Sequence, residues 1–432
     1  MSASFLPIAD IKDRLFQGAY DRQLTRFYGL TDNGLQSHRQ RIADALDAFR
    51  SKYGDLPVRV FSVSGRTELG GNHTDHQHGC VLAGAITLDI LAVAAHVDAR
   101  EIRVQSEGYA EDIVSLDCLS ADKSMNGTSA ALIRGTAAQF ASRGVSIGGL
   151  CVYTVSDVLK GSGVSSSAAF EVLLGTICND FFAENRFSPV EIAKIAQYAE
   201  NCYFGKPCGL MDQAACALGG VMAIDFDDPA QPVVRSIPLD LSHEGYALCI
   251  IDSRADHADL TDEYTAIPAE MQAVAYELDA DYLRDADPDA FWRNLIGLRK
   301  KCSDRAILRA IHFFDENQRV DKQVSALVNG DFSLYLQLVN ESGRSSAMLL
   351  QNLYASNNPH AQGVTLALAA AAHFLGGEGA FRVHGGGFAG TVQAYVPLAK
   401  CESFREKMDA VFGTGACHVL QIRAAGASAL WN

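Results

Sequence analysis

The fold of this chain is decided by GSGVSSSAAFEV, residues 161–172, which begins as a glycine and serine loop and continues as helix-forming sequence. It follows GGLCVYTVSD, residues 148–157, which is a predicted strand. A glycine loop between a strand and a helix N-terminus presents backbone N–H groups to an anion. The stretch therefore predicts a phosphate-binding loop, in which Ser166 and Ser167 reach a phosphate oxygen or a magnesium ion. A plain loop with a serine N-cap is the alternative.

Two other phosphate-binding patterns do not fit this loop. The P-loop pattern GxxxxGK[ST] is absent, because Lys160 precedes the glycines instead of following them. The dinucleotide-binding frame GxGxxG is not met by GSGVSS, and no acidic residue follows at a suitable distance. The loop therefore indicates another class of phosphate-binding protein.

A second polar stretch is NHTDHQHG, residues 72–79, which lies between the predicted strand VRVFSVSG and the apolar segment 80–97. A loop placed by two strands is well suited to hold a ligand. Three imidazoles and a carboxylate within six residues also form a set that can ligate a first-row metal. A metal-dependent hydrolase is disfavoured. The order of the histidines does not match the HxHxDH motif of metallo-β-lactamase-like enzymes, and no convincing metal ligands follow later in the sequence. The candidate ligands are His73, Asp75, His76 and His78.

The third stretch, ENCYFGKPCGLMDQ, covers residues 200–213 and carries two carboxylates around a Gly/Pro turn. We expect Glu200 to end one helix and Asp212 to begin another. One carboxylate can then hold a metal while the other faces a substrate hydroxyl, as phosphoryl transfer requires. Taken separately, each carboxylate is more often a solvated charge or a helix cap than a site residue.

The fourth stretch is HGGGFAGTVQAYV, residues 384–396, where four glycines stand between two predicted strands. Such glycines indicate a close approach of the backbone to a ligand or to another loop. A tight hairpin explains the glycines equally well.

The composition is that of a globular protein. The chain has 432 residues, of which 48% are hydrophobic and 20% charged, which suffices for two domains or one two-lobed domain. The start MSASFLPIADIKDRLF lacks the features of a secretory signal, and no later apolar stretch is long enough to span a bilayer. Eleven scattered cysteines without a CxxC pair fit reduced thiols. We therefore expect a soluble, cytoplasmic protein.

The charge balance narrows the choice of partners. The formal net charge is −15 and there is no run of Lys or Arg, so the sequence argues against nucleic-acid and membrane-surface binding. An anionic substrate would need a local positive site.

The order of predicted elements indicates two lobes. Residues 1–57 are predicted to form a helical arm, and helical periodicity recurs from about residue 266 to residue 356. We found no internal repeat or low-complexity linker. We place an N-terminal lobe at residues 1–225, including the arm, and a C-terminal lobe at 226–432.

The four stretches, in this order, resemble the galactokinase branch of the GHMP small-molecule kinases over nearly the whole chain. GRTELGGNHTDHQHG (65–79) resembles the galactokinase signature, and GSGVSSSAAFEV resembles the phosphate loop of the family. GGGFAG (385–390) resembles its third motif. Weaker similarity continues in DHADLTDEY, where Tyr264 follows His257 at the family spacing, and in ESGRSS at 341–346.

The resemblance implies an α+β fold of two lobes, with mixed and antiparallel sheets and the active site between the lobes. It implies ATP with Mg²⁺, and transfer of the γ-phosphoryl group to the anomeric hydroxyl of a sugar. Asp212 matches the catalytic base and Arg66 the neighbouring arginine. Glu200, Ser166 and Ser167 match the metal positions. The ATP-binding positions are Gly161, Ser162, Gly163, Ser165, Ser166, Ser167 and Ala168, and the substrate-binding positions are Asn72, His73, Asp75, Gly209 and Tyr264.

Departures from the family pattern fall on the sugar side. Asn72 replaces an acidic residue, and Glu68, Leu69, Gly70 and Gly71 replace Asn-Leu-Ile-Gly. An amide donates and accepts hydrogen bonds whereas a carboxylate only accepts them, so we expect Asn72 to influence the choice of sugar. Further replacements are His76 for tyrosine, Leu159 for proline and Asp256 for a basic residue.

Galactose is the first choice of acceptor. Galacturonate or another galactose-like sugar with a changed C6 group is the alternative, and a non-catalytic sugar sensor on the same scaffold is a third hypothesis. We expect a monomer or weak homo-oligomer that binds only the sugar and ATP.

Overall fold

The long antiparallel pair β1 (Arg59–Gly70) and β2 (Cys80–Val97) forms the centre of the larger sheet in the computed structural model. The structure describes residues 5–29, 32–158, 164–206, 208–254, 260–388 and 390–431. Every residue of β1 is buried, because helices cover both faces of the strand. Its pairing with β2 shifts register between Ser64 and Arg66 and again between Glu68 and Gly70. Such bulges re-aim side chains, and here they flank Arg66 and Glu68.

The larger sheet runs in the order β12–β1–β2–β5–β3–β4, and the β6–β7 hairpin pairs with the first half of β2. β3 pairs with β5 in parallel while the other neighbours are antiparallel, so the sheet is mixed. Its other strands are β3 (Glu101–Ser106), β4 (Asp112–Ser115), β5 (Gly149–Ser156), β6 (Val221–Asp225), β7 (Val233–Ile237) and β12 (Ser428–Ala429).

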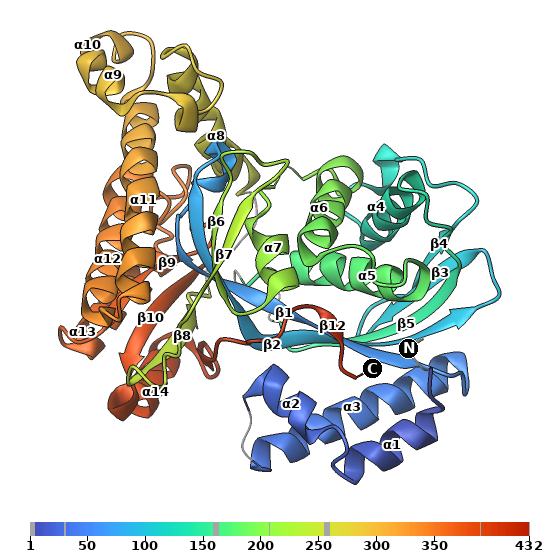
Figure 1. Cartoon of the computed structure of the whole chain (residues 1–432). Coiled ribbons are helices and arrows are strands. Elements are labelled where there is room, and N and C mark those ends of the chain that lie inside the picture. Colours follow the sequence, from blue (N-terminus) through green and yellow to red (C-terminus); the bar gives the residue numbers. More distant parts are fainter. Residues whose placement is uncertain are drawn as a thin grey trace.

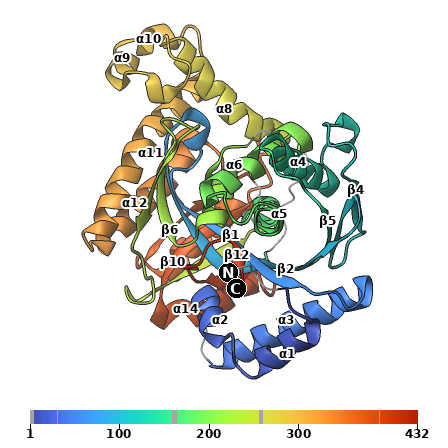
Figure 2. The ribbon, with the colours of Figure 1, turned by 45° about the vertical axis from the view of Figure 1, so that its right-hand side comes forward.

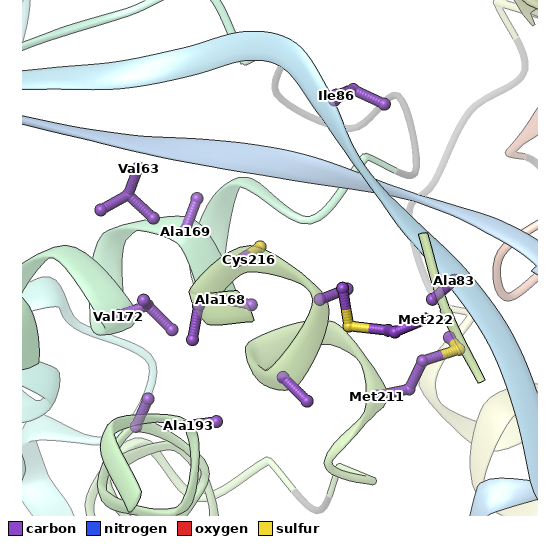
Figure 3. Close-up of a cluster of buried hydrophobic side chains, with 14 of the residues drawn as sticks. Val63, Ala83, Ile86, Ala168, Ala169, Val172, Ala193, Met211, Cys216 and Met222 are labelled. Atoms are coloured by element: carbon purple, nitrogen blue, oxygen red, sulfur yellow. The ribbon is translucent and has the colours of Figure 1, made fainter. Parts of the chain in front are cut away.

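Four helices cover one face of this sheet, and the N-terminal helices cover the other (Figure 1). A small residue lets α5 approach the sheet closely: Ala169 is buried and lies beside Val63 of β1, whereas the buried Ala168 points away from Val63 (Figure 3). A capping box between Ser188 and Glu191 fixes the start of α6. The four helices are α4 (Ser129–Ser142), α5 (Ser166–Phe182), α6 (Pro189–Ala199) and α7 (Met211–Leu218).

The predicted helical arm consists of α1 (Ile8–Phe16), α2 (Asp21–Tyr28) and α3 (Asp32–Tyr53). A buried charge network fastens it to the sheet. Asp89 of β2 accepts hydrogen bonds from Tyr28 Oη (2.7 Å), from Arg41 Nη1 (2.6 Å) and from Ser62. Arg423 lies 3.6 Å from the same carboxylate. Burial alone would raise the pKa of Asp89, but Arg41 and Arg423 hold it below its usual value, so the carboxylate stays charged.

The smaller sheet has the order β11–β8–β10–β9 and is antiparallel throughout. The long helices α11 and α12 stand beside it, and α8 to α10 project from the outer end of the molecule (Figures 1 and 2). The strands are β8 (Tyr246–Asp252), β9 (Ala380–His384), β10 (Thr391–Pro397) and β11 (Cys417–Leu420). The helices are α8 (Thr261–Tyr276), α9 (Pro288–Arg293), α10 (Leu295–Leu298), α11 (Asp304–Val328), α12 (Phe332–Ser345), α13 (Gly363–Leu375) and α14 (Cys401–Phe412).

The largest core cluster joins the two sheets. It contains residues of α5 to α7 together with Val320 of α11, Val339 of α12 and Ile250 of β8. The hairpin partner β7 also follows the predicted lobe boundary at residue 225 and still belongs to the larger sheet. The division at 225 therefore stays a prediction, whereas the predicted α+β fold with mixed and antiparallel sheets is confirmed. None of the described helices is long and apolar enough to cross a membrane.

Candidate active site

A bidentate ion pair between Arg66 and Asp212 lies where β1 meets the start of α7. Arg66 Nε donates to Asp212 Oδ1 (2.7 Å) and Nη2 donates to Oδ2 (2.9 Å). The arginine side chain is 6% exposed and the aspartate side chain 33% exposed, so the carboxylate is the more accessible of the two groups. Burial would raise the pKa of Asp212, but Arg66 and a hydrogen bond from Ser165 hold it below its usual value. The carboxylate is therefore ionised at neutral pH.

The described end of the predicted phosphate loop touches this pair. Ser165 adopts a left-handed conformation (φ 60°) immediately before α5, and its hydroxyl donates to Asp212 Oδ2. Arg66 N donates to Val164 O (3.1 Å), so β1 and the loop are tied together. Ser166 and Ser167 open the helix half-buried, and Ala168 is buried beneath them. The predicted ATP-binding residues Gly161, Ser162 and Gly163, and also Leu159, lie outside the described residues.

Glu200 follows the last residue of α6, as predicted, and begins a π-helical turn that ends at Phe204. Its side chain is only 4% exposed, and Oε2 accepts a hydrogen bond from Gln213 Nε2 (2.8 Å). The same amide donates to Glu171 Oε2 (3.2 Å). Burial, and then the charge of Glu200, raise the pKa of Glu171 well above its usual value.

Lys206 contacts the Glu200 carboxylate from the side that faces solvent. Its Nζ lies 3.3 Å from Glu200 Oε1, and its side chain is 64% exposed. The ammonium group also interacts electrostatically with Asp212 and Tyr264. The two predicted site carboxylates, Glu200 and Asp212, therefore both interact with one exposed cation.

The loop of residues 72–79, which carries predicted sugar-binding residues, places Asp75 against Gly209. A Cβ atom at Gly209 would collide with the Asp75 carboxylate, so only glycine permits this approach. His73 has a left-handed backbone (φ 60°), and its Nε2 lies 3.0 Å from Gly386 O. Because a carbonyl only accepts, Nε2 carries the proton. Burial, and then His76, lower the pKa of His73 to about 3, so the ring is neutral.

The glycine hairpin between β9 and β10 forms the neighbouring wall. The ring of Tyr264 lies over Gly386, where a Cβ atom would not fit, and Tyr264 Oη donates to Gly387 O (3.1 Å). Five of the predicted sugar-side residues therefore lie on two facing loops and one helix: His73, Asp75, Gly209, Tyr264 and, behind them, Asn72. His257 and Asp256 lie outside the described residues.

Asn72 differs from its neighbours because it is fully buried and has no free polar atom. Its amide nitrogen donates to Glu68 (3.0 Å) and to Gly385 O (2.7 Å), and its oxygen accepts from Asn352 (2.9 Å) and Ser346 (3.2 Å). A direct contact with a sugar would break these bonds. We therefore propose that Asn72 supports the loop from behind instead of touching the substrate.

A cluster of charged groups that sequence reasoning missed surrounds Glu68. Arg382 pairs with Glu68, and Glu316 accepts from the backbone N–H of Gly71 (3.1 Å) and from Ser342 (2.6 Å). Burial raises the pKa of Glu68 to about 7, although Arg382 and Arg66 oppose the shift. These residues lie far apart in sequence, so no local pattern could have found them.

The histidine-rich stretch does not form a metal cluster. Among the described residues, no group of three or more His, Cys, Asp or Glu side chains is arranged to hold a metal ion. The ring of His78 stacks on Tyr282, with 3.6 Å between the ring centroids. The ring of His73 has a different partner, Gly386 O. The magnesium positions predicted at Glu200, Ser166 and Ser167 involve a single carboxylate and stay a prediction.

Comparisons with known proteins agree with this geometry. Residues 131–220 match the profile of the GHMP kinases N terminal domain, and residues 47–96 match the galactokinase galactose-binding signature. A galactokinase of Streptomyces coelicolor is 30% identical over 373 residues, which is 85% of this chain and 92% of that protein.

Solved structures show the same fold. A Lactococcus lactis galactokinase complexed with galactose has a TM-score of 0.76 at 23% identity, covering 90% of this chain and 100% of its own. The mevalonate kinase of Methanococcus jannaschii has a TM-score of 0.59 at 12% identity, covering 84% and 98%.

The fold and the paired loops are those of the GHMP class of small-molecule kinases. Within that class, the chain belongs to the galactokinase branch, as its sequence resemblance implies. It is accordingly a phosphotransferase with an alcohol group as acceptor.

Proposed function

We propose that this protein is an ATP-dependent sugar 1-kinase that phosphorylates the anomeric hydroxyl of D-galactose. The observation that carries the proposal is the Arg66–Asp212 pair beside Ser165, at the N-terminus of α5. An ionised carboxylate next to an anion-binding helix N-terminus can bring a hydroxyl and a phosphoryl group together. The galactose-binding signature in residues 47–96 and the galactokinase relatives support galactose as the acceptor.

Asp212 orients the anomeric hydroxyl and accepts its proton. The hydroxyl oxygen forms a bond to the γ-phosphorus as the bond from that phosphorus to the β–γ bridging oxygen breaks, and ADP keeps the electron pair. Arg66 keeps Asp212 ionised. Its two hydrogen bonds, one to each carboxylate oxygen, also fix the orientation of the carboxylate. General-base help is worth about 10²- to 10⁴-fold, so positioning and electrostatic stabilisation supply most of the acceleration.

Glu200, with the hydroxyl groups of Ser166 and Ser167, fits a magnesium ion chemically. These are hard oxygen donors of the kind that Mg²⁺ takes with phosphate oxygens. In the structure a cation already occupies Oε1 of Glu200, namely the Lys206 ammonium group. When bound, the ion would neutralise part of the triphosphate charge.

The acceptor is tested with galactose, galacturonate, N-acetylgalactosamine and glucose in a coupled assay of ADP release. We expect turnover with galactose, and phosphorus NMR should show a sugar 1-phosphate instead of a 6-phosphate. Preference for galacturonate would replace galactose as the substrate and keep the reaction class. Absence of sugar-dependent turnover with all four sugars would overturn the proposal.

A further inference from the structure

Lys206 is the one basic residue in the stretch 200–213, and its backbone is fixed on Glu200. Gly205 (φ 83°) ends the π-helical turn, and the N–H groups of Gly205 and Lys206 both donate to Glu200 O (3.0 and 3.2 Å). The Lys206 side chain then turns back toward the carboxylate of the same residue, with Nζ 3.3 Å from Oε1. The turn therefore holds an ammonium group at a defined place beside Glu200.

Two of the partners of the Glu200 carboxylate differ in exposure. Gln213 is fully buried and holds Oε2 from inside, whereas Lys206 holds Oε1 with a side chain that is 64% exposed. An exposed lysine has four rotatable bonds and gains little from a single surface ion pair. The ammonium group can therefore leave Glu200 without disturbing the buried side of the site.

Two further groups lie within electrostatic range of the Lys206 ammonium group. They are Asp212, the proposed base, and Tyr264 at the glycine hairpin. The space between Glu200 and Asp212 is the place that the proposed reaction gives to the transferred phosphoryl group. That group carries negative charge on three oxygens as it moves from donor to acceptor, and a positioned cation stabilises this charge.

We propose that Lys206 is a further catalytic residue, whose ammonium group leaves Glu200 when the nucleotide binds and contacts an oxygen of the transferred phosphoryl group. The inference rests on the proposed function. In the transfer step the ammonium group keeps its proton: the hydroxyl proton goes to Asp212, and the electron pair of the broken bond stays on ADP. Lys206 contributes only charge and hydrogen bonds, so its effect falls on nucleotides that carry a γ-phosphate.

The kinetic test compares Lys206→Met, Lys206→Arg and wild type in the coupled assay with galactose. Lys206→Met should lower kcat by about 10- to 100-fold, less than the loss of a fully buried oxyanion donor, and should change the KM for sugar less than about 2-fold. Lys206→Arg keeps the charge and should stay within about 10-fold of wild type. Lys300→Met, at an exposed lysine beyond α10, is the matched control and should behave as wild type.

A binding test separates a contact with the γ-phosphate from a structural role. The affinities of wild type and Lys206→Met are measured by calorimetry for ADP and for the β,γ-imido analogue of ATP, both with magnesium. We expect about 10-fold weaker binding of the analogue and less than 2-fold weaker binding of ADP. Equal losses for both nucleotides, or no loss for either, would overturn the role of Lys206 even if wild type is active. A wild-type protein that neither phosphorylates a sugar nor binds nucleotide would overturn the proposed function together with this inference.

Discussion

Two arginine–carboxylate pairs meet strand β1 only two residues apart, yet they differ in what they can do. Arg66 pairs with Asp212, whose side chain is 33% exposed and whose pKa is held below its usual value. Glu68 pairs with Arg382, and both side chains are at most 2% exposed. Burial raises the pKa of Glu68 to about 7, because its partners offset only part of the desolvation. The first pair leaves a charged carboxylate partly exposed, whereas the second joins the two sheets.

The largest expected effect comes from breaking the half-exposed pair. Asp212→Asn removes the proton acceptor, so we expect kcat to fall by at least about 1,000-fold. The substitution also leaves the buried Arg66 without its counter-charge, so we expect the free energy of unfolding to fall as well. Steady-state kinetics and thermal unfolding measure the two quantities. Sugar binding, followed by calorimetry, should persist, and retained activity would remove Asp212 from its proposed role.

Breaking the buried pair should affect stability instead of chemistry. Arg382→Met leaves Glu68 without its cation, and we expect a loss of about 3 kcal/mol in urea unfolding, at the low end for a broken buried pair because Glu68 can take up a proton. The double variant Arg382→Met/Glu68→Gln should recover part of the loss. Arg405→Met, which breaks an exposed pair with Glu402, should cost less than about 1 kcal/mol. Equal losses for the buried and exposed pairs would contradict the comparison.

The pH dependence of stability should reveal the raised pKa of Glu68. Between its ordinary pKa of 4.5 and the folded value of about 7, the folded protein binds more protons than the unfolded chain. The contribution of Glu68 to stability is therefore complete below pH 4.5 and is lost as the pH rises through 7, by about 2 kcal/mol between pH 5 and pH 7.

Comparison of wild type with Glu68→Gln isolates this contribution from that of Glu316. The pKa of Glu316 is lowered to about 2, because His312 and the arginines Arg319 and Arg382 outweigh the effect of burial. Its contribution is lost in the opposite direction, as the pH falls from 4.5 toward 2. The difference in unfolding free energy between wild type and Glu68→Gln should therefore change between pH 5 and pH 7, and a constant difference would contradict the assignment.

The smallest expected effect concerns Tyr264, at the wall of the site that holds the first of the two pairs. Tyr264→Phe removes one hydrogen bond, from Oη to Gly387 O, at the wall of the site. We expect a cost of about 1 kcal/mol, seen as a rise of up to about 5-fold in the KM for sugar with kcat nearly unchanged. A fall in kcat as large as that of Asp212→Asn would place Tyr264 in the chemical step.

The sequence predicted those elements whose pattern is strong and local. The strands around NHTDHQHG, the strand before GSGVSSSAAFEV, helix α5 and the helix ends at Glu200 and Asp212 all occur where we expected them. Long apolar strands and a glycine loop before a helix depend on neighbouring residues only. The strands β3, β4 and β7 escaped prediction, because each is short and partly exposed and therefore carries only a weak pattern.

Contacts between residues far apart in the sequence limited how much of the site could be predicted. The Glu68–Arg382 pair joins residues 314 positions apart, and Asn72 is bonded to α11, to the turn Ser346–Leu350 and to the glycine hairpin. Sequence spacing contains no information about either. Lys206 is different, because its isolated basic charge between Glu200 and Asp212 was visible in the sequence and could have been singled out.

The pairing of β12 with β1 has a consequence for how the chain is made. Phe61 lies opposite Ala429, so one edge of the strand that carries Arg66 pairs with a segment that is synthesised 368 residues later. Until then the N–H and C=O groups along that edge are open to wrong partners. A newly made chain therefore has the greatest need of a chaperone, which would shield this edge, during this interval. Contacts of such long range also slow folding.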